Sequence, residues 1–329
     1  HVAVRTRAGV FDMSHLGQVE VAGRDALDTL QQACCSDVGQ LEVGQVGSSA
    51  LTTPAGTFLD SVLVYRLAGS HFLLVTSAAN TEKDAAWIAG YAKPGGDVAV
   101  LNTSTRYAQI AVQGPVAREL LEPLTRGDLS ALASGCFDHG EVAGVRATIA
   151  RTGRTGEDGY EVLVPPQQAL KAWNAVLAAG AGLGAIPAGL GAYDTLRLEA
   201  GWPEYGCEID ASTTVLEAGL EGMVAWDKGD FSGRAALAEQ RAHGISRRLV
   251  GFEMVDRVVP ERGSRLLAGE ESVGSVTSGA EAPSLAKAIG MGYVRIELSG
   301  AGSKFEVDVR GTRARARVVP LPFYQCRKG

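Results

Sequence analysis

The chain has 329 residues, enough for two or three domains at ~100–200 residues each. Hydrophobic residues make up 46% and charged residues 21%, which is typical of a globular protein and argues against a disordered chain or a coiled coil. The 37 acidic and 31 basic residues give a net charge of −6, so no nucleic acid partner is expected. The apolar runs are far shorter than the ~18 residues that span a bilayer, so no membrane span is predicted.

The five cysteines, at positions 34, 35, 136, 207 and 326, include no CxxC pair. Their odd number disfavours a disulfide framework, and the spacing disfavours a cysteine-based zinc site. The adjacent Cys34 and Cys35 are therefore interpreted as small buried hydrophobic residues. The five histidines form no HExxH motif, so no metal site is predicted. The first residues contain no signal-peptide core, which favours a cytoplasmic protein, and we expect some native residues to precede His1.

Strand-like and helix-like runs alternate irregularly in the first part of the chain. Residues 60–67 and 71–76 predict two strands of a hairpin, joined by an Ala-Gly-Ser turn. Asn80 is a candidate N-cap for the helix that follows, whose first turn is acidic. Residues 109–112 predict another short strand, and the Gly-Pro pair at 114–115 is expected to open a short helix.

Three more helices are predicted before residue 245. Two prolines at 165–166 precede an amphipathic helix that Gly180 is expected to end. Four residues at helical spacing define its predicted apolar face: Leu170, Trp173, Val176 and Leu177. Residues 194–200 and 233–243 predict the other two helices.

The pattern changes near residue 245, where long helical runs give way to short strands separated by turn residues. The strand-like runs are 249–255, 264–269, 272–279, 290–298, 305–311 and 314–319. They predict an all-β sandwich or barrel over 246–329. Residues 1–245 are then a lobe of two interleaved α+β subdomains.

The most unusual local sequence is RTGRTGEDGYE at 151–161. Its glycines at 153, 156 and 159 permit positive φ angles and the close approach of another group to the backbone. It is not a phosphate loop, because the Lys-Ser/Thr pair is missing and a strand follows instead of a helix. At the start of that strand, the Glu161 carboxylate can accept paired N–H donors from an aminopyrimidine ring. An irregular turn with a solvent-facing glutamate is the alternative interpretation.

Other motifs point to structure more than to chemistry. Asp194 and Arg197 lie three residues apart on a predicted helix and are interpreted as a structural ion pair. No GxSxG elbow supports a Ser–His–Asp triad, and no GxGxxG motif supports a dinucleotide site. The residues alone thus predict an α+β protein with a candidate small-molecule site at 151–161, and no particular reaction.

A set of blocks along the whole chain is similar to the glycine-cleavage T-protein family, the aminomethyltransferases. The first block runs from His1 to Gly17 and includes GVFDMSHLG. The later blocks follow in the family's order: SAANTEKD (77–84), QGP (113–115), RTGRTGEDGYE (151–161), PAGLGAYDTLRLEAG (187–201), YGCEID (205–210), TTVLEAGL (213–220), DKGDFSGRAAL (227–237), SVTSG (275–279) and LPFY (321–324). The related iron–sulfur assembly folate proteins carry a KGCYxGQE-like block, which 227–237 does not match.

The resemblance implies an α+β fold of three domains, a cloverleaf with a C-terminal β-barrel, around a central channel that holds tetrahydrofolate. Members of the family receive an aminomethyl group from the lipoyl arm of H-protein, release ammonia and form 5,10-methylene-tetrahydrofolate. Relatives demethylate other donors onto the same cofactor. We therefore expect a small-molecule or lipoyl-carried one-carbon donor, with H-protein as a candidate partner.

The resemblance also transfers roles to single residues. Glu161 matches the glutamate that binds the pterin, and Asp60 matches the first aspartate of a Gly-Gly-x-x-Asp-Asp block. Ser61 stands where the second, catalytic aspartate belongs, so Asp60 and Ser61 are the catalytic candidates. Four ligand positions differ from the family: Ser48 replaces a tyrosine, Ser77 an asparagine, Arg154 a tyrosine, and Tyr193 an arginine that helps to hold the folate tail. These differences indicate a divergent member with a remodelled pocket.

Two functions follow from these residues. The first is a tetrahydrofolate-dependent one-carbon transferase, in which a carboxylate stabilises the positive charge that develops on the transferred carbon. Strand alternation points Asp60 away from the Ser61 side unless a bulge re-aims it. The second is a folate-binding or regulatory protein without turnover, or one that holds a different small molecule in the same cavity.

Overall fold

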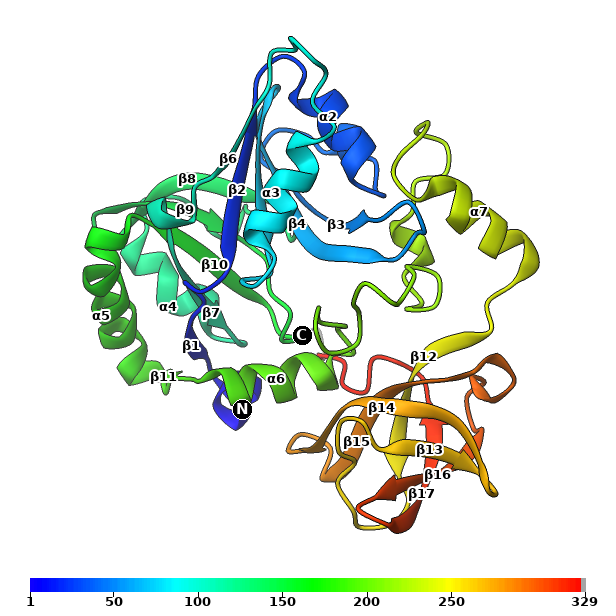
Figure 1. Cartoon of the computed structure of the whole chain (residues 1–329). Coiled ribbons are helices and arrows are strands. Elements are labelled where there is room, and N and C mark those ends of the chain that lie inside the picture. The colour runs from blue at the N-terminus through cyan, green and yellow to red at the C-terminus, as the bar shows by residue number, and fades with distance from the viewer. Residues whose placement is uncertain (327–329) are drawn as a thin grey trace.

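The computed structural model describes residues 1–326, which form two stacked β-sheets with helices on their outer faces and a separate closed barrel (Figure 1). The predicted α+β fold with a C-terminal β-barrel is confirmed. Within the described residues, no helix is both long and apolar enough to cross a membrane.

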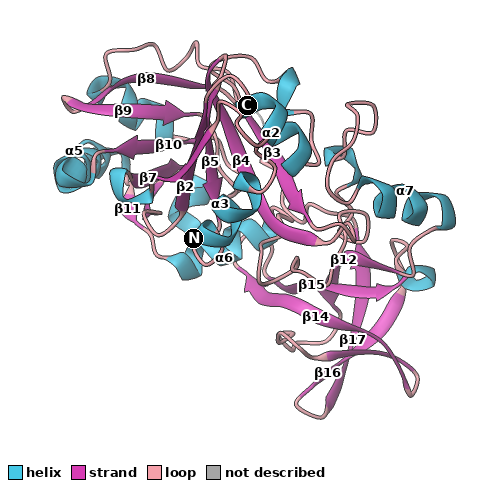
Figure 2. Ribbon diagram, turned by 45° about the horizontal axis from the view of Figure 1, so that its top comes forward, coloured by secondary structure: helices cyan, strands magenta, loops and turns pink. Residues whose placement is uncertain are grey.

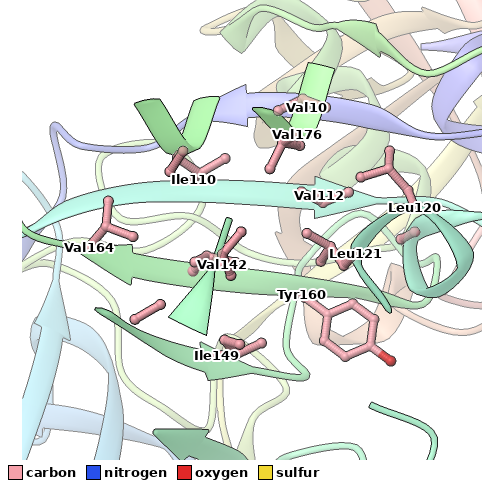
Figure 3. Packing of buried hydrophobic residues seen from close by; sticks show 14 of the residues in the cluster. Val10, Ile110, Val112, Leu120, Leu121, Val142, Ile149, Tyr160, Val164 and Val176 are labelled. Atoms are coloured by element: carbon pink, nitrogen blue, oxygen red, sulfur yellow. The ribbon is translucent and has the colours of Figure 1, made fainter. Parts of the chain in front are cut away.

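The first sheet has six strands in the order β11-β1-β7-β10-β9-β8. Their bounds are β1 (Gly9–Asp12), β7 (Ala108–Gln113), β8 (Phe137–Val142), β9 (Val145–Ala150), β10 (Gly159–Val164) and β11 (Ile186–Pro187). The outer face is covered by α4 (Ala117–Leu121) and α5 (Ala169–Gly180). Figure 3 shows this core, in which Val176 of α5 packs over Val112 of β7 and its neighbours.

The second sheet has five strands in the order β3-β4-β5-β2-β6. Their bounds are β2 (Gly17–Ala22), β3 (Val46–Thr52), β4 (Phe58–Ala68), β5 (His71–Thr76) and β6 (Ala99–Asn102). The predicted hairpin of β4 and β5 is confirmed. Helices α2 (Ala26–Ala33) and α3 (Thr81–Ala89) cover the outer face through a second apolar cluster.

The inner faces of the two sheets pack against each other (Figure 2). Tyr65 and Leu73 of the second sheet contact the same buried cluster as Phe137 and Leu163 of the first. Because both faces of β10 are covered, all six of its residues are buried and the strand carries no polar alternation. The layers are therefore helix, sheet, sheet, helix, and any ligand site between the sheets lies at an end of this stack.

The barrel closes in the order β12-β15-β14-β13-β16-β17. Its strands are β12 (Arg247–Met254), β13 (Arg265–Ala268), β14 (Glu271–Ala282), β15 (Lys287–Arg295), β16 (Lys304–Val309) and β17 (Thr312–Val319). All six strands predicted from the sequence are present. The regular spacing of turn residues located them, because each strand of a small barrel must be short and must end at a turn.

The remaining helices connect these units. Their bounds are α1 (Val2–Thr6), α6 (Leu190–Glu199) and α7 (Arg234–His243), and the 3₁₀ helices are η1 (Val38–Gln40), η2 (Ser104–Arg106), η3 (Glu122–Leu124), η4 (Pro166–Gln168), η5 (Ala181–Leu183), η6 (Glu221–Met223) and η7 (Ile296–Leu298). Helix α6 runs between the sheets and the barrel (Figure 1), and Leu198 on it packs against barrel residues such as Met291.

Some local predictions need correction. Helix α4 begins at Ala117, not at the Gly-Pro pair, because Gly114 at φ +132° packs against the backbone of the α1 segment. Asn80 precedes α3 but forms no side-chain cap hydrogen bond. Leu170 is 70% exposed, because the buried stripe of α5 runs instead through Ala172 and Val176. The prediction that Cys34 and Cys35 are buried is confirmed.

Arg197 of α6 is the largest fully buried side chain of the described residues and joins α6 to the barrel. Its guanidinium pairs with Asp194 at 2.6 Å, which confirms the predicted ion pair, and with the buried Glu208 at 2.5 Å. It also donates to Ser278 Oγ of β14 at 2.9 Å. The neighbouring carboxylates raise the pKa of Arg197 against the opposing effect of burial, so the side chain is permanently charged.

Replacing Arg197 by alanine is expected to destabilise the protein strongly. Glu208 would remain buried without its cation, and breaking such a buried pair costs about 3–5 kcal/mol. Denaturant unfolding followed by circular dichroism measures the loss. Arg24→Ala is the control, because its pair with Asp97 is solvent-exposed and its removal should leave stability unchanged. Equal stability of R197A and wild type would contradict a structural role for this network.

Candidate functional site

The 151–161 block wraps around the side chain of Gln113, the first residue of the QGP block. Gln113 Nε2 donates to the carbonyl of Thr152 at 2.9 Å, and Thr155 Oγ1 donates to Gln113 Oε1 at 3.0 Å. A Cβ atom on Gly153 would lie 2.0 Å from Gln113 Oε1, and one on Gly159 would lie 2.6 Å from the same side chain. The glycines are therefore required because an amide side chain fills the space where their own side chains would lie.

Ion pairs also stabilise the 151–161 block, both within it and to other segments of the chain. The Arg151 guanidinium pairs with the Asp158 carboxylate at 2.7 Å, which closes the turn on itself. Arg5 of α1 pairs with Glu157 at 3.1 Å and with the buried Glu199 of α6 at 2.9 Å. The Arg5 guanidinium also lies 3.8 Å from the ring centre of Tyr324, in the segment that follows the barrel. Segments from both ends of the described chain thus meet at this turn.

Glu161 lies on β10 with its side chain toward the second sheet. Its neighbours Tyr160 and Val162 belong to the outer core, whereas Leu163 belongs to the cluster between the sheets, so alternation directs Glu161 inward. Glu161 is 6% exposed, and its Oε2 accepts a hydrogen bond from Thr152 Oγ1 at 2.6 Å. The strand start is not solvent-facing, so the alternative of an exposed glutamate is wrong.

Tyr65 of β4 faces Glu161 from the second sheet. Its hydroxyl is buried and forms no hydrogen bond of ordinary geometry within residues 1–326. Burial and the nearby Glu161 carboxylate raise the pKa of Tyr65 against the opposing effect of the neighbouring Thr152 hydroxyl, so the phenol stays protonated. A buried polar group without a partner costs free energy, which favours a ligand atom as its partner.

A cavity of about 200 Å³ opens next to Thr152, the hydrogen-bond donor to Glu161, although neither Glu161 nor Tyr65 is among its lining residues. Its wall includes Ser48, Leu63, Thr152, Arg154 and Trp202. Arg154 forms no ion pair or hydrogen bond within the described residues, so its guanidinium is available to a ligand. The volume is below the ~300–1,000 Å³ usual for small-molecule sites, so the cavity suits a ring system better than a whole extended ligand.

Tyr193 of α6 lies close enough to Arg154 and Glu161 for their charges to change its pKa. Burial raises the pKa of Tyr193 to about 12, with Arg154 lowering it and Glu161 raising it. The ring packs edge-on against Phe11, with centroids 5.8 Å apart. The structure therefore brings together Ser48, Arg154, Glu161 and Tyr193, four of the residues predicted from the sequence.

Asp60 and Ser61 lie on opposite faces of β4. Asp60 shares the outer face with Val62 and Val64, which pack beneath the helices, and it is fully buried. Ser61 is half-buried and shares the inner face with Leu63, which lines the cavity. A bulge does interrupt the pairing of β3 with β4 just before Asp60, but it does not turn Asp60 to the inner face.

Ser77 belongs with Asp60 and not with the cavity group. The Asp60 carboxylate accepts hydrogen bonds from the Ser77 backbone N–H at 2.8 Å and from Ser77 Oγ at 2.7 Å. Behind this pair lies Asp84 of α3, also fully buried. Burial and the adjacent Asp60 raise the pKa of the Asp84 carboxyl to about 9.

Sequence reasoning missed several residues of this site. Tyr65 and Trp202 carry no motif, and only the tertiary structure places them near the 151–161 turn. Gln113 had a signal, since QGP was among the family-like blocks, but its contact with the 151–161 turn is tertiary. Asp84 closes the SAANTEKD block, where an acidic residue predicts only the first turn of a helix.

Two other features do not join the site. A larger cavity, of about 1150 Å³, lies at one end of the barrel and is lined by Glu253, Arg257, Lys304 and Arg317 among others. Its charges are mixed and largely paired with one another, as in the Lys287–Glu253 bridge. Within residues 1–326, no cluster of three or more His, Cys, Asp or Glu side chains is arranged to hold a metal ion.

Comparison with known families accounts for this architecture. The GCVT N-terminal domain matches residues 1–228, and the glycine cleavage T-protein C-terminal barrel domain matches residues 247–325. The chain belongs to the glycine cleavage T-protein family. This confirms the family suggested by the sequence blocks.

Individual T-proteins are similar over nearly the whole chain. An aminomethyltransferase of Geobacillus kaustophilus is 45% identical over 327 residues, which cover 99% of this chain and 89% of that protein. The aminomethyltransferase of Bacillus subtilis is 42% identical, with 99% and 90% covered. The crystal structure of glycine cleavage system aminomethyltransferase T from Bartonella henselae superposes with a TM-score of 0.92 at 31% identity, covering 99% of this chain and 89% of that one.

Proposed function

We propose that this protein is a tetrahydrofolate-dependent one-carbon transferase of the aminomethyltransferase type. The observation that carries the proposal is the buried Glu161 carboxylate, which faces the buried Tyr65 hydroxyl and accepts a hydrogen bond from Thr152 in the wall of the cavity. The names of the similar proteins support the reaction type. Ser61 at the position of the catalytic aspartate favours a non-catalytic folate-binding or regulatory role, but we prefer the transferase because similar proteins over nearly the whole chain are named aminomethyltransferases.

The residues present fit a reduced pterin. Thr152 donates to Glu161 Oε2, and no group of the described chain donates to Oε1, so one carboxylate oxygen remains free to accept N–H donors. Tyr65 supplies an additional hydroxyl, and Trp202 an aromatic surface at the cavity wall. Glu161 would therefore hold the aminopyrimidine edge, and Arg154 would face an anionic part of the ligand.

Bound tetrahydrofolate would supply the nitrogen that accepts the one-carbon unit. The contribution of the chain is then to orient the ligand through Glu161, to exclude water between the sheets, and to surround the reacting carbon with suitable charge. Ser61 on the inner face of β4 presents a neutral hydroxyl there. We propose a lipoyl-carried aminomethyl group from H-protein as the donor and the cytoplasm as the compartment, with a methyl donor as the alternative.

Glu161→Ala is expected to weaken reduced-folate binding by about 2–4 kcal/mol, because it removes a charged acceptor and leaves the buried N–H donors of the ligand unpaired. Folding should be nearly unaffected, since only the Thr152 bond is lost. Isothermal calorimetry with tetrahydrofolate measures the affinity. Glu161→Gln keeps the shape and the contact with Thr152 but lacks the charge, so it should bind with intermediate affinity. Unchanged affinity in E161A would refute the pterin-binding role.

The wild-type protein is expected to have little preference for polyglutamylated folate. Tyr193 stands where the family has the arginine that helps to hold the folate tail, and a cation, Arg154, is found instead in the 151–161 turn. Wild type should bind mono- and triglutamylated tetrahydrofolate with similar affinity. The double variant R154Y/Y193R should favour the triglutamate roughly two- to fivefold, as expected for a partly exposed ion pair. Y193F controls for the lost hydroxyl. A strong triglutamate preference in wild type would contradict this prediction.

Ser61→Asp tests whether a carboxylate is missing from the inner face of β4. A hydroxyl cannot balance a developing positive charge as a carboxylate does, and losing such a partner typically slows a reaction ~10²–10³-fold. Wild type should therefore form methylene-tetrahydrofolate slowly from aminomethylated H-protein, and S61D should form it faster. S61A should resemble wild type. Ordinary enzyme rates in wild type, reduced in S61D, would show that Ser61 is no defect.

A further inference from the structure

Two carboxyl groups meet behind the cavity wall, and the function proposed above uses neither. Asp60 of β4 and Asp84 of α3 are both fully buried, and the Asp84 carboxyl lies within hydrogen-bonding reach of Asp60. Within the described residues, neither oxygen of Asp84 receives a hydrogen bond from an N–H or O–H donor. A buried carboxyl with no donor of its own is most favourable when it carries a proton and donates that proton to an acceptor.

The surrounding charges agree with one proton between the two groups. Two carboxylates in a dry site cannot both ionise at low cost, so one of them retains its proton. The charged groups that act on Asp84 are Asp60 from β4 and Lys83 from α3, with opposite effects on its pKa. Lys83 does not satisfy Asp84, because its Nζ donates to the Leu59 carbonyl at 2.8 Å.

The pair is connected to the turn that joins β5 to α3. Both oxygens of Asp60 are engaged by Ser77, one by the backbone N–H and one by Oγ. From the other side, Thr81 Oγ1 lies 3.3 Å from the Ser77 carbonyl and 3.1 Å from Thr76 Oγ1. Ser77 in this turn is therefore bound both by Asp60 and by Thr81, and of these two contacts only the one with Asp60 involves a neighbour of Asp84.

We propose that Asp60 and Asp84 share one proton and thereby lock the 77–80 turn to β4, which positions the cavity wall formed by the opposite face of that strand. Leu63 on that face lines the cavity and pairs with Ser48 of β3 and Val75 of β5. Loss of the shared proton places two negative charges together and releases the turn. Both aspartates are positioning residues, and their effect on ligand binding rests on the proposed function.

Thermal unfolding of the full chain between pH 5 and pH 10 tests the shared proton without any ligand. Asp84 titrates near its ordinary value of ~3.9 when unfolded and at about 9 when folded, so its stabilising contribution is complete at low pH and is lost progressively as the pH rises toward 9. Asp84→Asn keeps a donor to Asp60 and does not titrate. The Tm of D84N minus that of wild type should therefore grow with pH and level off above about 9.

The exposed Asp138→Asn is the matched control, and its Tm should follow wild type at every pH. A difference between D84N and wild type that does not change with pH would overturn the proposal. Should D84N fail to fold, infrared spectroscopy of wild type labelled with ¹³C-aspartate answers the same question. A protonated carboxyl band should persist at neutral pH and disappear near pH 9, and in D60N it should disappear at lower pH. Its absence from wild type at neutral pH would also overturn the proposal.

Reduced-folate affinity measured over the same pH range tests the positioning effect. Wild-type affinity should fall above the pKa of Asp84, approaching ~tenfold per pH unit, whereas the affinity of D84N should stay level. Parallel profiles for the two proteins would overturn the link to the cavity. Failure of both to bind folate at any pH would refute the proposed function and leave the stability and infrared results to decide on the shared proton.

Discussion

The two-residue period of β4 governs what the candidate site can do. The sheet that contains β4 is covered by helices on one side and by the other sheet on the opposite side, so consecutive side chains enter different surroundings. Asp60 enters the helix side and is engaged by Ser77, whereas Ser61 enters the side of the cavity. The bulge before Asp60 does not change this assignment. Of these two positions on β4, only position 61 can therefore place a charge on the cavity side, and here it carries a hydroxyl.

A second constraint is the register between β7 and β10. Glu161 pairs with Ala111, two residues before Gln113, and the chain between these strands returns as the turn that encloses the Gln113 side chain. The QGP and RTGRTGEDG blocks are thus one structural unit, although about forty residues separate them. The turn fixes Thr152, and Thr152 fixes one oxygen of Glu161. The glycines and the glutamate consequently serve one purpose, which is to present a carboxylate at a defined angle.

Much of the fold was predictable because the signals were local. The barrel strands and the β4–β5 hairpin have turn residues at both ends, which mark a strand whatever it packs against. Strand β10 buries both faces, so its sequence does not alternate, and Leu170 of α5 is apolar yet exposed. The family-like blocks predicted Glu161. Tyr65 and Asp84 were not predicted, because they approach Glu161 and Asp60 only through the packing of strands and helices that are distant in sequence. The division into domains at 245/246 stays a prediction.

Buried ion pairs connect the segments of the chain around the site. Arg5 bridges Glu157 of the glycine-rich turn to Glu199 of α6, and two residues earlier on that helix Arg197 reaches the barrel through Ser278. The turn, α6 and the barrel are therefore connected by buried cations, whose pairs cannot open without exposing unpaired charge to an apolar interior. Such a frame limits the movement of the 151–161 turn relative to α6 and the barrel, and Glu161 follows that turn on β10. For a reaction whose rate depends mainly on positioning, a fixed carboxylate at the ligand is the property that this part of the fold supplies.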